Sequence, residues 1–115
     1  MNPKIPAAAL ALLLVATAFA EEAKGKVTFL SPADGTVVKL GDKVTVSYEA
    51  DLGPKGNHLH LYLDDRRMEV LRQTKGTADI LMQLPGTHEI CLEIETSWHF
   101  STGVRQCVNV NVNMK

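Results

Sequence analysis

The chain has 115 residues, of which 45% are hydrophobic and 22% charged, and a formal net charge of −1. This length suits one domain and is too short for two of ordinary size. The charges are nearly balanced, and the longest basic run in the body of the chain is Arg66-Arg67. Composition therefore gives no support to nucleic acid or to an anionic membrane surface as a partner.

The first twenty residues have the pattern of a signal peptide. Lys4 precedes an apolar stretch over residues 7–18, which is shorter than the roughly 18–20 residues that a membrane-spanning helix needs. Ala18 and Ala20 then place small side chains where signal peptidase accepts them. We expect cleavage between Ala20 and Glu21, a periplasmic or secreted location, and no membrane span in the mature form.

The mature chain, residues 21–115, alternates apolar and polar residues with a period of two, and it sustains no helical period. Turns rich in glycine, proline and aspartate divide it into about seven short strands. This pattern predicts a seven-stranded immunoglobulin-like or fibronectin-III-like β-sandwich. The predicted strands lie, in chain order, near residues 27–40 (with a turn inside), 44–48, 58–63, 68–71, 78–82, 88–94 and 104–112.

The two cysteines, Cys91 and Cys107, fall on the polar face of the last two predicted strands. If these strands form a hairpin about residue 99, the cysteines lie directly opposite each other, at a separation that a disulfide accepts. Disulfides are the usual state of paired cysteines in exported proteins. We therefore predict a disulfide, which by loop entropy is worth roughly 3 kcal/mol, rather than thiolate metal ligands or a catalytic thiol.

The histidines are the residues best suited to a metal site. His58 and His60 form an H-x-H pattern on one predicted strand, so both rings project from the same face about 6–7 Å apart. His99 lies in a loop that this fold places at the same end of the domain. Imidazoles without thiolates suit copper(II) or zinc(II). Further candidate ligands near this end are Tyr62, Asp51 and Glu95.

The fourth histidine, His88, begins the sixth predicted strand and should lie near the opposite end of the domain. It falls on the apolar face, where a ring nitrogen capping a turn is the simpler interpretation. Its participation in the metal site is the less favoured alternative.

Three motifs in this chain resemble those of a family of small exported bacterial proteins of unknown function. That family carries a G-H-H-H-L-x-I-D strand, an L-x-P-G-T-H-T-L strand and an acidic-x-x-x-H loop. The resemblance implies an immunoglobulin/fibronectin-III-like fold and the histidine pattern, and no settled activity. Here Asn57 and Leu59 replace the opening glycine and the middle histidine, and the cysteine pair is extra. The corresponding segments are residues 57–64 (NHLHLYLD), 84–90 (LPGTHEI) and 95–99 (ETSWH).

The same H-x-H and P-G-x-H patterns also resemble cupins, which hold a metal inside a small barrel. That fold would group His88 with His58 and His60, with Asp64 or Asp65 as a further candidate ligand, and would leave His99 out. The proline–glycine–histidine spacing is compressed relative to cupins and the chain is short for a barrel, so we favour the sandwich.

No nucleophile elbow, phosphate-binding glycine loop or H-E-x-x-H motif occurs in the sequence, so we do not expect an enzyme. The main hypothesis is an exported domain that binds a transition metal, copper before zinc, through His58, His60 and His99. The alternative is a structural or interaction module, without metal, that binds an envelope protein partner.

Overall fold

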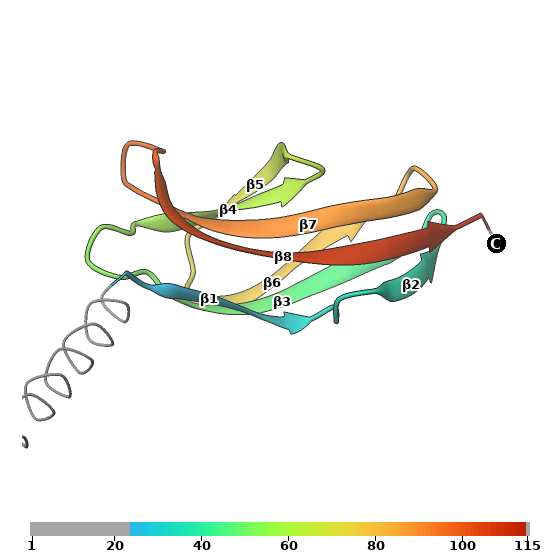
Figure 1. Ribbon diagram of the computed structural model, residues 1–115, viewed down its shortest axis with the longest axis horizontal. Helices are drawn as coiled ribbons and strands as arrows, with labels where there is room; N and C mark the ends of the chain where they lie inside the picture. The colour runs from blue at the N-terminus through green and yellow to red at the C-terminus, as the bar shows by residue number, and fades with distance from the viewer. Residues whose placement is uncertain (1–23, 115) are drawn as a thin grey trace, which may run out of the picture.

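The structure, a computed structural model, describes residues 24–114, so the predicted signal peptide and its cleavage site lie outside the described residues. Two β-sheets pack face to face (Figure 1). The smaller has the strand order β1-β3-β6, and the larger has the order β2-β8-β7-β4-β5. The strands are β1 (Lys26–Ser31), β2 (Thr36–Lys39), β3 (Lys43–Asp51), β4 (His58–Leu63), β5 (Arg66–Leu71), β6 (Lys75–Leu81), β7 (Gly86–Glu95) and β8 (Ser101–Asn113).

The fold is the predicted all-β sandwich, but with eight strands rather than seven. The first predicted strand is divided by the turn at residues 31–35, which moves the chain from one sheet to the other. β1 pairs antiparallel with β3, whereas β2 pairs in parallel with β8. Asp34 Oδ1 secures this crossing by accepting a hydrogen bond of 2.7 Å from Asn109 N–H.

The core follows from the alternation seen in the sequence, because every second side chain of a strand enters the space between the sheets. On β3, Val44, Val46 and Tyr48 are buried, while Thr45 between them is exposed. The other strands contribute Val27, Leu59, Leu61, Leu71, Ala78, Ile80, Ile90, Leu92, Ile94, Val108, Val110 and Val112 to the core, and Met82 follows β6.

No helix in residues 24–114 is long and apolar enough to cross a membrane.

The predicted disulfide is confirmed, and it lies at the predicted register. Cys91 and Cys107 are direct partners across the β7–β8 hairpin, with Cα atoms 4.1 Å apart. The predicted polar face is only partly right, because Cys91 is fully buried while Cys107 is exposed. Tyr62, the partner of Cys91 on β4, occupies the same outer face of the sheet.

Removing the disulfide tests how much of the stability it supplies. In a Cys91→Ala/Cys107→Ala variant we expect the free energy of unfolding to fall by about 3 kcal/mol, because the unfolded chain regains the entropy of an open loop. Urea denaturation measures this loss. Reducing agent should destabilise the parent protein by a similar amount and leave the variant unchanged; equal stability of variant and parent would contradict the prediction.

His88 ties the turn before β7 to the tip of the β4–β5 hairpin. Its Nδ1 lies 2.5 Å from Asp64 Oδ2, and its Nε2 lies 2.8 Å from the carbonyl oxygen of Leu84. Hydrogen bonding to Asp64 outweighs burial and raises the pKa of His88. Burial raises the pKa of Asp64, but hydrogen bonds from His88 and Glu89 N–H more than offset this and lower it.

These pKa shifts predict a pH dependence of stability. The raised pKa of His88 stabilises the fold fully below about pH 6.5, and this contribution is lost as the pH rises through the raised value. The lowered pKa of Asp64 means that its carboxylate stabilises the fold above about pH 4. This contribution to stability is lost as the pH falls further. The parent should therefore exceed a His88→Gln variant in stability most between about pH 4 and 6.5. Because Asp64 is half exposed, the advantage should be on the order of 1 kcal/mol or less. Parallel stability curves of parent and variant between pH 5 and about 9 would contradict this assignment.

Candidate metal centre

Strand β4 holds the H-x-H histidines on one face of the larger sheet. Leu59 and Leu61 point into the core and are fully buried, so His58 and His60 point to the outer face. β4 pairs with β5 on one side and β7 on the other, which fixes its register. The outer face is not solvated here: His58 is 1% exposed and His60 is 2% exposed.

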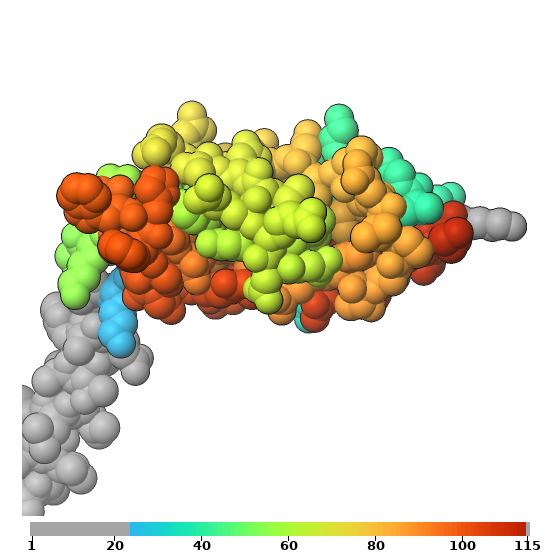
Figure 2. Space-filling model, turned by 90° about the horizontal axis from the view of Figure 1, so that it is seen from above, coloured from blue at the N-terminus to red at the C-terminus, as the bar shows by residue number. Residues whose placement is uncertain are grey.

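The third histidine arrives from the tip of the β7–β8 hairpin, which bends over the start of β4 (Figure 1). Figure 2 shows this tip in orange-red beside the β4–β5 hairpin in yellow-green. Thr96 organises the turn: its N–H donates to Phe100 O over 2.8 Å, and its carbonyl accepts from His99 N–H over 3.0 Å. His99 has φ of 64°, a left-handed conformation that is uncommon for a residue with a Cβ and is held by these bonds.

Three ring nitrogens converge at this point. His58 Nε2 lies 3.0 Å from His60 Nε2, and His99 Nδ1 lies 3.1 Å from each of them. Three nitrogens that bind one ion at about 2.0–2.1 Å must lie within about 3–3.5 Å of one another. The triangle meets that requirement. Sequence reasoning brought these histidines to the same end of the domain, and the structure places them in mutual contact.

The remaining ring nitrogens of the two buried histidines contact oxygen atoms. His58 Nδ1 lies 2.9 Å from Asn57 Oδ1, which is an acceptor, so Nδ1 carries the proton. His60 Nδ1 lies 3.3 Å from Tyr62 Oη and 3.5 Å from Glu95 Oε1. When Nδ1 carries the proton in both neutral rings, the two Nε2 lone pairs face each other and His99. Metal-binding histidines show this arrangement, in which an oxygen fixes the nitrogen that does not bind the metal.

Burial keeps both inner histidines neutral. It lowers the pKa of His60 to about 4, with the positive charges that His58 and Arg67 would contribute acting in the same direction. Burial, followed by the proximity of His99, also lowers the pKa of His58. Neutral imidazoles offer lone pairs without competition from protons, which is the state that metal binding requires.

Two glutamates lie beside the histidines on β7. Glu95 is 3% exposed, and its Oε2 has no hydrogen-bond partner. Burial and the neighbouring Glu93 raise the pKa of Glu95 to about 8. For Glu93, burial raises the pKa, but the hydrogen bond with Glu95 and the charge of Arg105 lower it overall. Glu93 is therefore the ionised member of the pair at neutral pH.

Arg105 completes this polar layer. Its guanidinium lies 5.0 Å from the centroid of the Tyr62 ring, and its nitrogens lie 3.4 Å from Glu93 Oε2 and 2.8 Å from Asp65 Oδ1. Asn57, Glu93 and Arg105 were not among the site residues predicted from the sequence. One feature of the sequence pointed to Asn57, since this residue replaces a glycine next to the first histidine of the motif.

The other predicted site residues lie elsewhere. Asp51 is exposed at the end of β3, where its Oδ1 accepts a hydrogen bond of 3.1 Å from Gly53 N–H. His88 is bound to Asp64 at the other end of β4, so the cupin-like grouping of His88 with His58 and His60 does not form. Within residues 24–114, the one other cluster of potential ligands is Glu89 with Cys91 and Cys107, whose sulfurs are bonded to each other.

Comparisons with known proteins show the fold. No protein-family model matches the chain, and no curated protein matches it significantly, so the resemblance to the exported bacterial family is supported only at the level of fold. The chain is similar to the fibronectin(III)-like modules of Clostridium thermocellum CbhA, with a TM-score of 0.63 and 14% identity over 76% of this chain and 95% of that chain. A lytic polysaccharide monooxygenase from Jonesia denitrificans gives a TM-score of 0.49 and 16% identity over 72% of this chain and 61% of that chain, too weak a similarity to bear on function. The chain thus has a fibronectin III-like β-sandwich fold.

Proposed function

We propose that this protein is an exported β-sandwich domain that binds one transition-metal ion, copper or zinc, through His58, His60 and His99. This proposal rests on the triangle formed by the three ring nitrogens, whose sides are 3.0, 3.1 and 3.1 Å. With the proton on Nδ1 of both buried rings, two Nε2 lone pairs 3.0 Å apart would repel each other, and a cation between them would remove that repulsion.

The three donor nitrogens favour metal ions of intermediate softness, such as copper(II) and zinc(II). It contains imidazole nitrogens alone, whereas copper(I) favours thiolates and thioethers. Nitrogens at these separations and about 2.0–2.1 Å from one ion subtend angles of about 95° at the ion. The arrangement is pyramidal, so further coordination positions lie on the side away from the three nitrogens. It suits copper(II) and zinc(II), and copper binds such nitrogen sites more tightly than zinc.

Metal titration tests the site directly. Protein stripped with a chelator should bind one equivalent of copper(II) or zinc(II), as measured by isothermal titration calorimetry, and the ion should raise the melting temperature. A His58→Gln/His60→Gln variant, shown to be folded by circular dichroism, should lose at least about 100-fold in affinity. His99→Ala should weaken binding as well, because it removes an exposed ligand without disturbing the core.

His88→Gln provides the matched control, since it removes a histidine outside the cluster. Its affinity for the metal should equal that of the parent. Unchanged affinity in both the double variant and His99→Ala would exclude the proposed site.

The oxygen atoms behind the ligands give a second prediction. Asn57→Ala removes the acceptor for His58 Nδ1, and Glu95→Ala removes an acceptor for His60 Nδ1. Each change should lower metal affinity by about 10- to 100-fold, because the ring is no longer held in the binding orientation and tautomer. Thr45→Ala, on the outer face of the other sheet, serves as the control. Parent-like affinity in both Asn57→Ala and Glu95→Ala would show that these contacts do not orient the ligands.

One observation favours the alternative of a metal-free envelope interaction module. Trp98 is 79% exposed and Phe100 is 71% exposed, at the tip of the β7–β8 hairpin. Exposed aromatic side chains are frequent anchors of protein interfaces. This alternative requires that chelators leave the stability unchanged and that added copper or zinc has no effect on it.

A further inference from the structure

Two arginines near β5 lie on the same face of the larger sheet as the histidine cluster. Arg67 is the cross-strand partner of Tyr62 on β4, and directly opposed residues share a face. Leu71 is buried in the core, so Arg72, the next residue, points to the outer face. Continuing the β4–β5 register places Arg72 beside His58. The cluster therefore has a guanidinium group toward each end of β5.

The guanidinium groups of Arg67 and Arg72 have no counter-ion, since neither forms an ion pair within residues 24–114. Both residues are exposed. Burial is the main cause of the lowered pKa of His58, and the positive charges of Arg72 and Arg67 contribute to it. Arginine presents its N–H donors in a planar fork that matches the two oxygens of a carboxylate. The face that carries the histidines therefore also offers donors for an anion.

The charges around the cluster do not neutralise a bound divalent ion. The three candidate ligands bind a metal as neutral imidazoles. A third arginine, Arg105, is paired with Glu93 and Asp65. Even with Glu95 ionised, these three carboxylates only balance the three arginines, and both charges of the ion remain. An anion bound at the metal would offset that excess.

The histidine triangle leaves the metal ion accessible to such an anion. Its three nitrogens bind an ion from one side only. His58 and His60 are buried, whereas His99 is exposed, so the cluster reaches solvent at His99. The hairpin that carries His99 comes from the β7 side of β4, and the two arginines lie on the β5 side. Metal ions with three protein ligands take a further ligand from solution.

We propose that the metal-loaded site binds a small carboxylate anion, with one carboxylate oxygen on the metal ion and the charge of the anion paired with Arg67 and Arg72. This inference rests on the proposed metal site and names the class of its external ligand. Carboxylate oxygen is an established ligand of zinc(II). By linkage, the metal and the carboxylate should each raise the affinity for the other by the same factor.

Copper(II) supplies the readout. Protein that holds one equivalent of copper(II) is titrated with sodium acetate at pH 7, while sodium perchlorate keeps the ionic strength constant. The visible absorption band and the electron paramagnetic resonance spectrum of the copper follow binding. We expect a saturable change with acetate and none with perchlorate alone. Fluorescence quenching of Trp98, the single tryptophan, reports that the copper stays bound. Tighter binding of phosphate than of acetate would contradict the assignment to carboxylates.

An arginine variant separates a role in anion binding from a structural one. Arg67→Gln/Arg72→Gln should lower the affinity of the copper-loaded protein for acetate by about tenfold or more, because it removes charge-assisted hydrogen bonds. In perchlorate its affinity for copper(II) should equal or exceed that of the parent, because two positive charges near the ion are gone. Damage to the fold of the site would lower both affinities.

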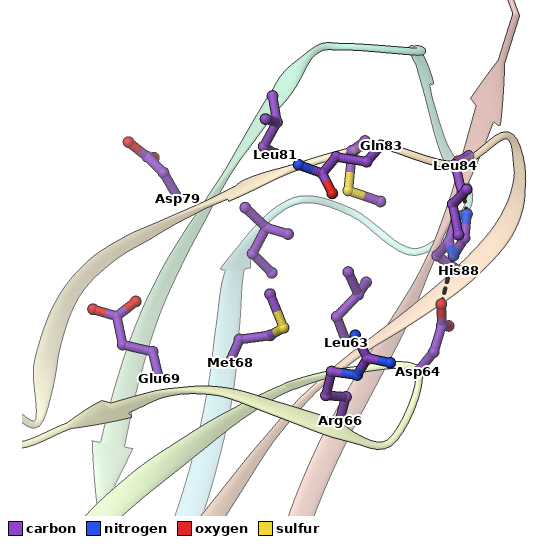
Figure 3. Close-up of a pocket in the computed structure, with 12 residues that line it drawn as sticks. Leu63, Asp64, Arg66, Met68, Glu69, Asp79, Leu81, Gln83, Leu84 and His88 are labelled. Atoms are coloured by element: carbon purple, nitrogen blue, oxygen red, sulfur yellow. Dashed lines mark hydrogen bonds and ion pairs between the residues drawn. The ribbon is translucent and has the colours of Figure 1, made fainter.

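Arg66→Gln/Lys75→Gln is the matched control, since it also removes two positive charges. Figure 3 shows Arg66 at the groove that β5 and β6 line, and Lys75 pairs with Glu49 on the smaller sheet. Both affinities of this control variant should equal those of the parent.

The outcomes distinguish this inference from the metal site on which it rests. A parent protein that binds no copper overturns both. With copper bound, three results overturn the carboxylate site alone. These are a copper spectrum that does not respond to acetate, unchanged acetate affinity in the arginine variant, and an equal rise of melting temperature with acetate in metal-free and copper-loaded protein.

Discussion

The register of β4 is the constraint on which the site depends. Leu59 and Leu61 are fully buried between the sheets, and this burial fixes the opposite orientation for His58 and His60. Because side chains alternate strictly, a slip of one residue would put both imidazoles into the apolar core and both leucines on the outer face. The hydrophobic free energy of the leucines thus orients two of the three candidate ligands before any metal is present.

Burial of the outer face distinguishes this domain from a simple sandwich with one solvated side. Polar groups lose their water there, and a polar group left without a partner costs about 1–3 kcal/mol. Asn57, Tyr62 and Glu95 provide partners for the outward nitrogens of the two inner histidines. The inner nitrogens of the two rings and His99 Nδ1 then lie within 3.0–3.1 Å of one another.

The sequence carried the local information and lacked the tertiary information. Alternation predicted the sandwich and the shared face of His58 and His60, and the position of residue 99 predicted that Cys91 and Cys107 are paired across the hairpin. The sequence could not predict that the outer face of the larger sheet is covered at β4, because that depends on the bend of the β7–β8 hairpin over β4. By contrast, the hairpin centred on residue 99 that pairs the cysteines also places Glu93 opposite Arg105, so this contact could have been predicted from the sequence. The division of the first strand depends on the turn at residues 31–35, which moves the chain between the two sheets.

The disulfide connects the candidate metal centre to the compartment in which the protein would work. His99 is held in a left-handed conformation at the tip of a long hairpin, and hairpin tips fray readily unless they are constrained. The bond between Cys91 and Cys107 closes that hairpin and limits how far its two strands can separate. Disulfides persist in oxidising compartments. An oxidising environment keeps this disulfide formed and so helps to hold His99 in place. The predicted export signal and the geometry of the site are therefore consistent with each other.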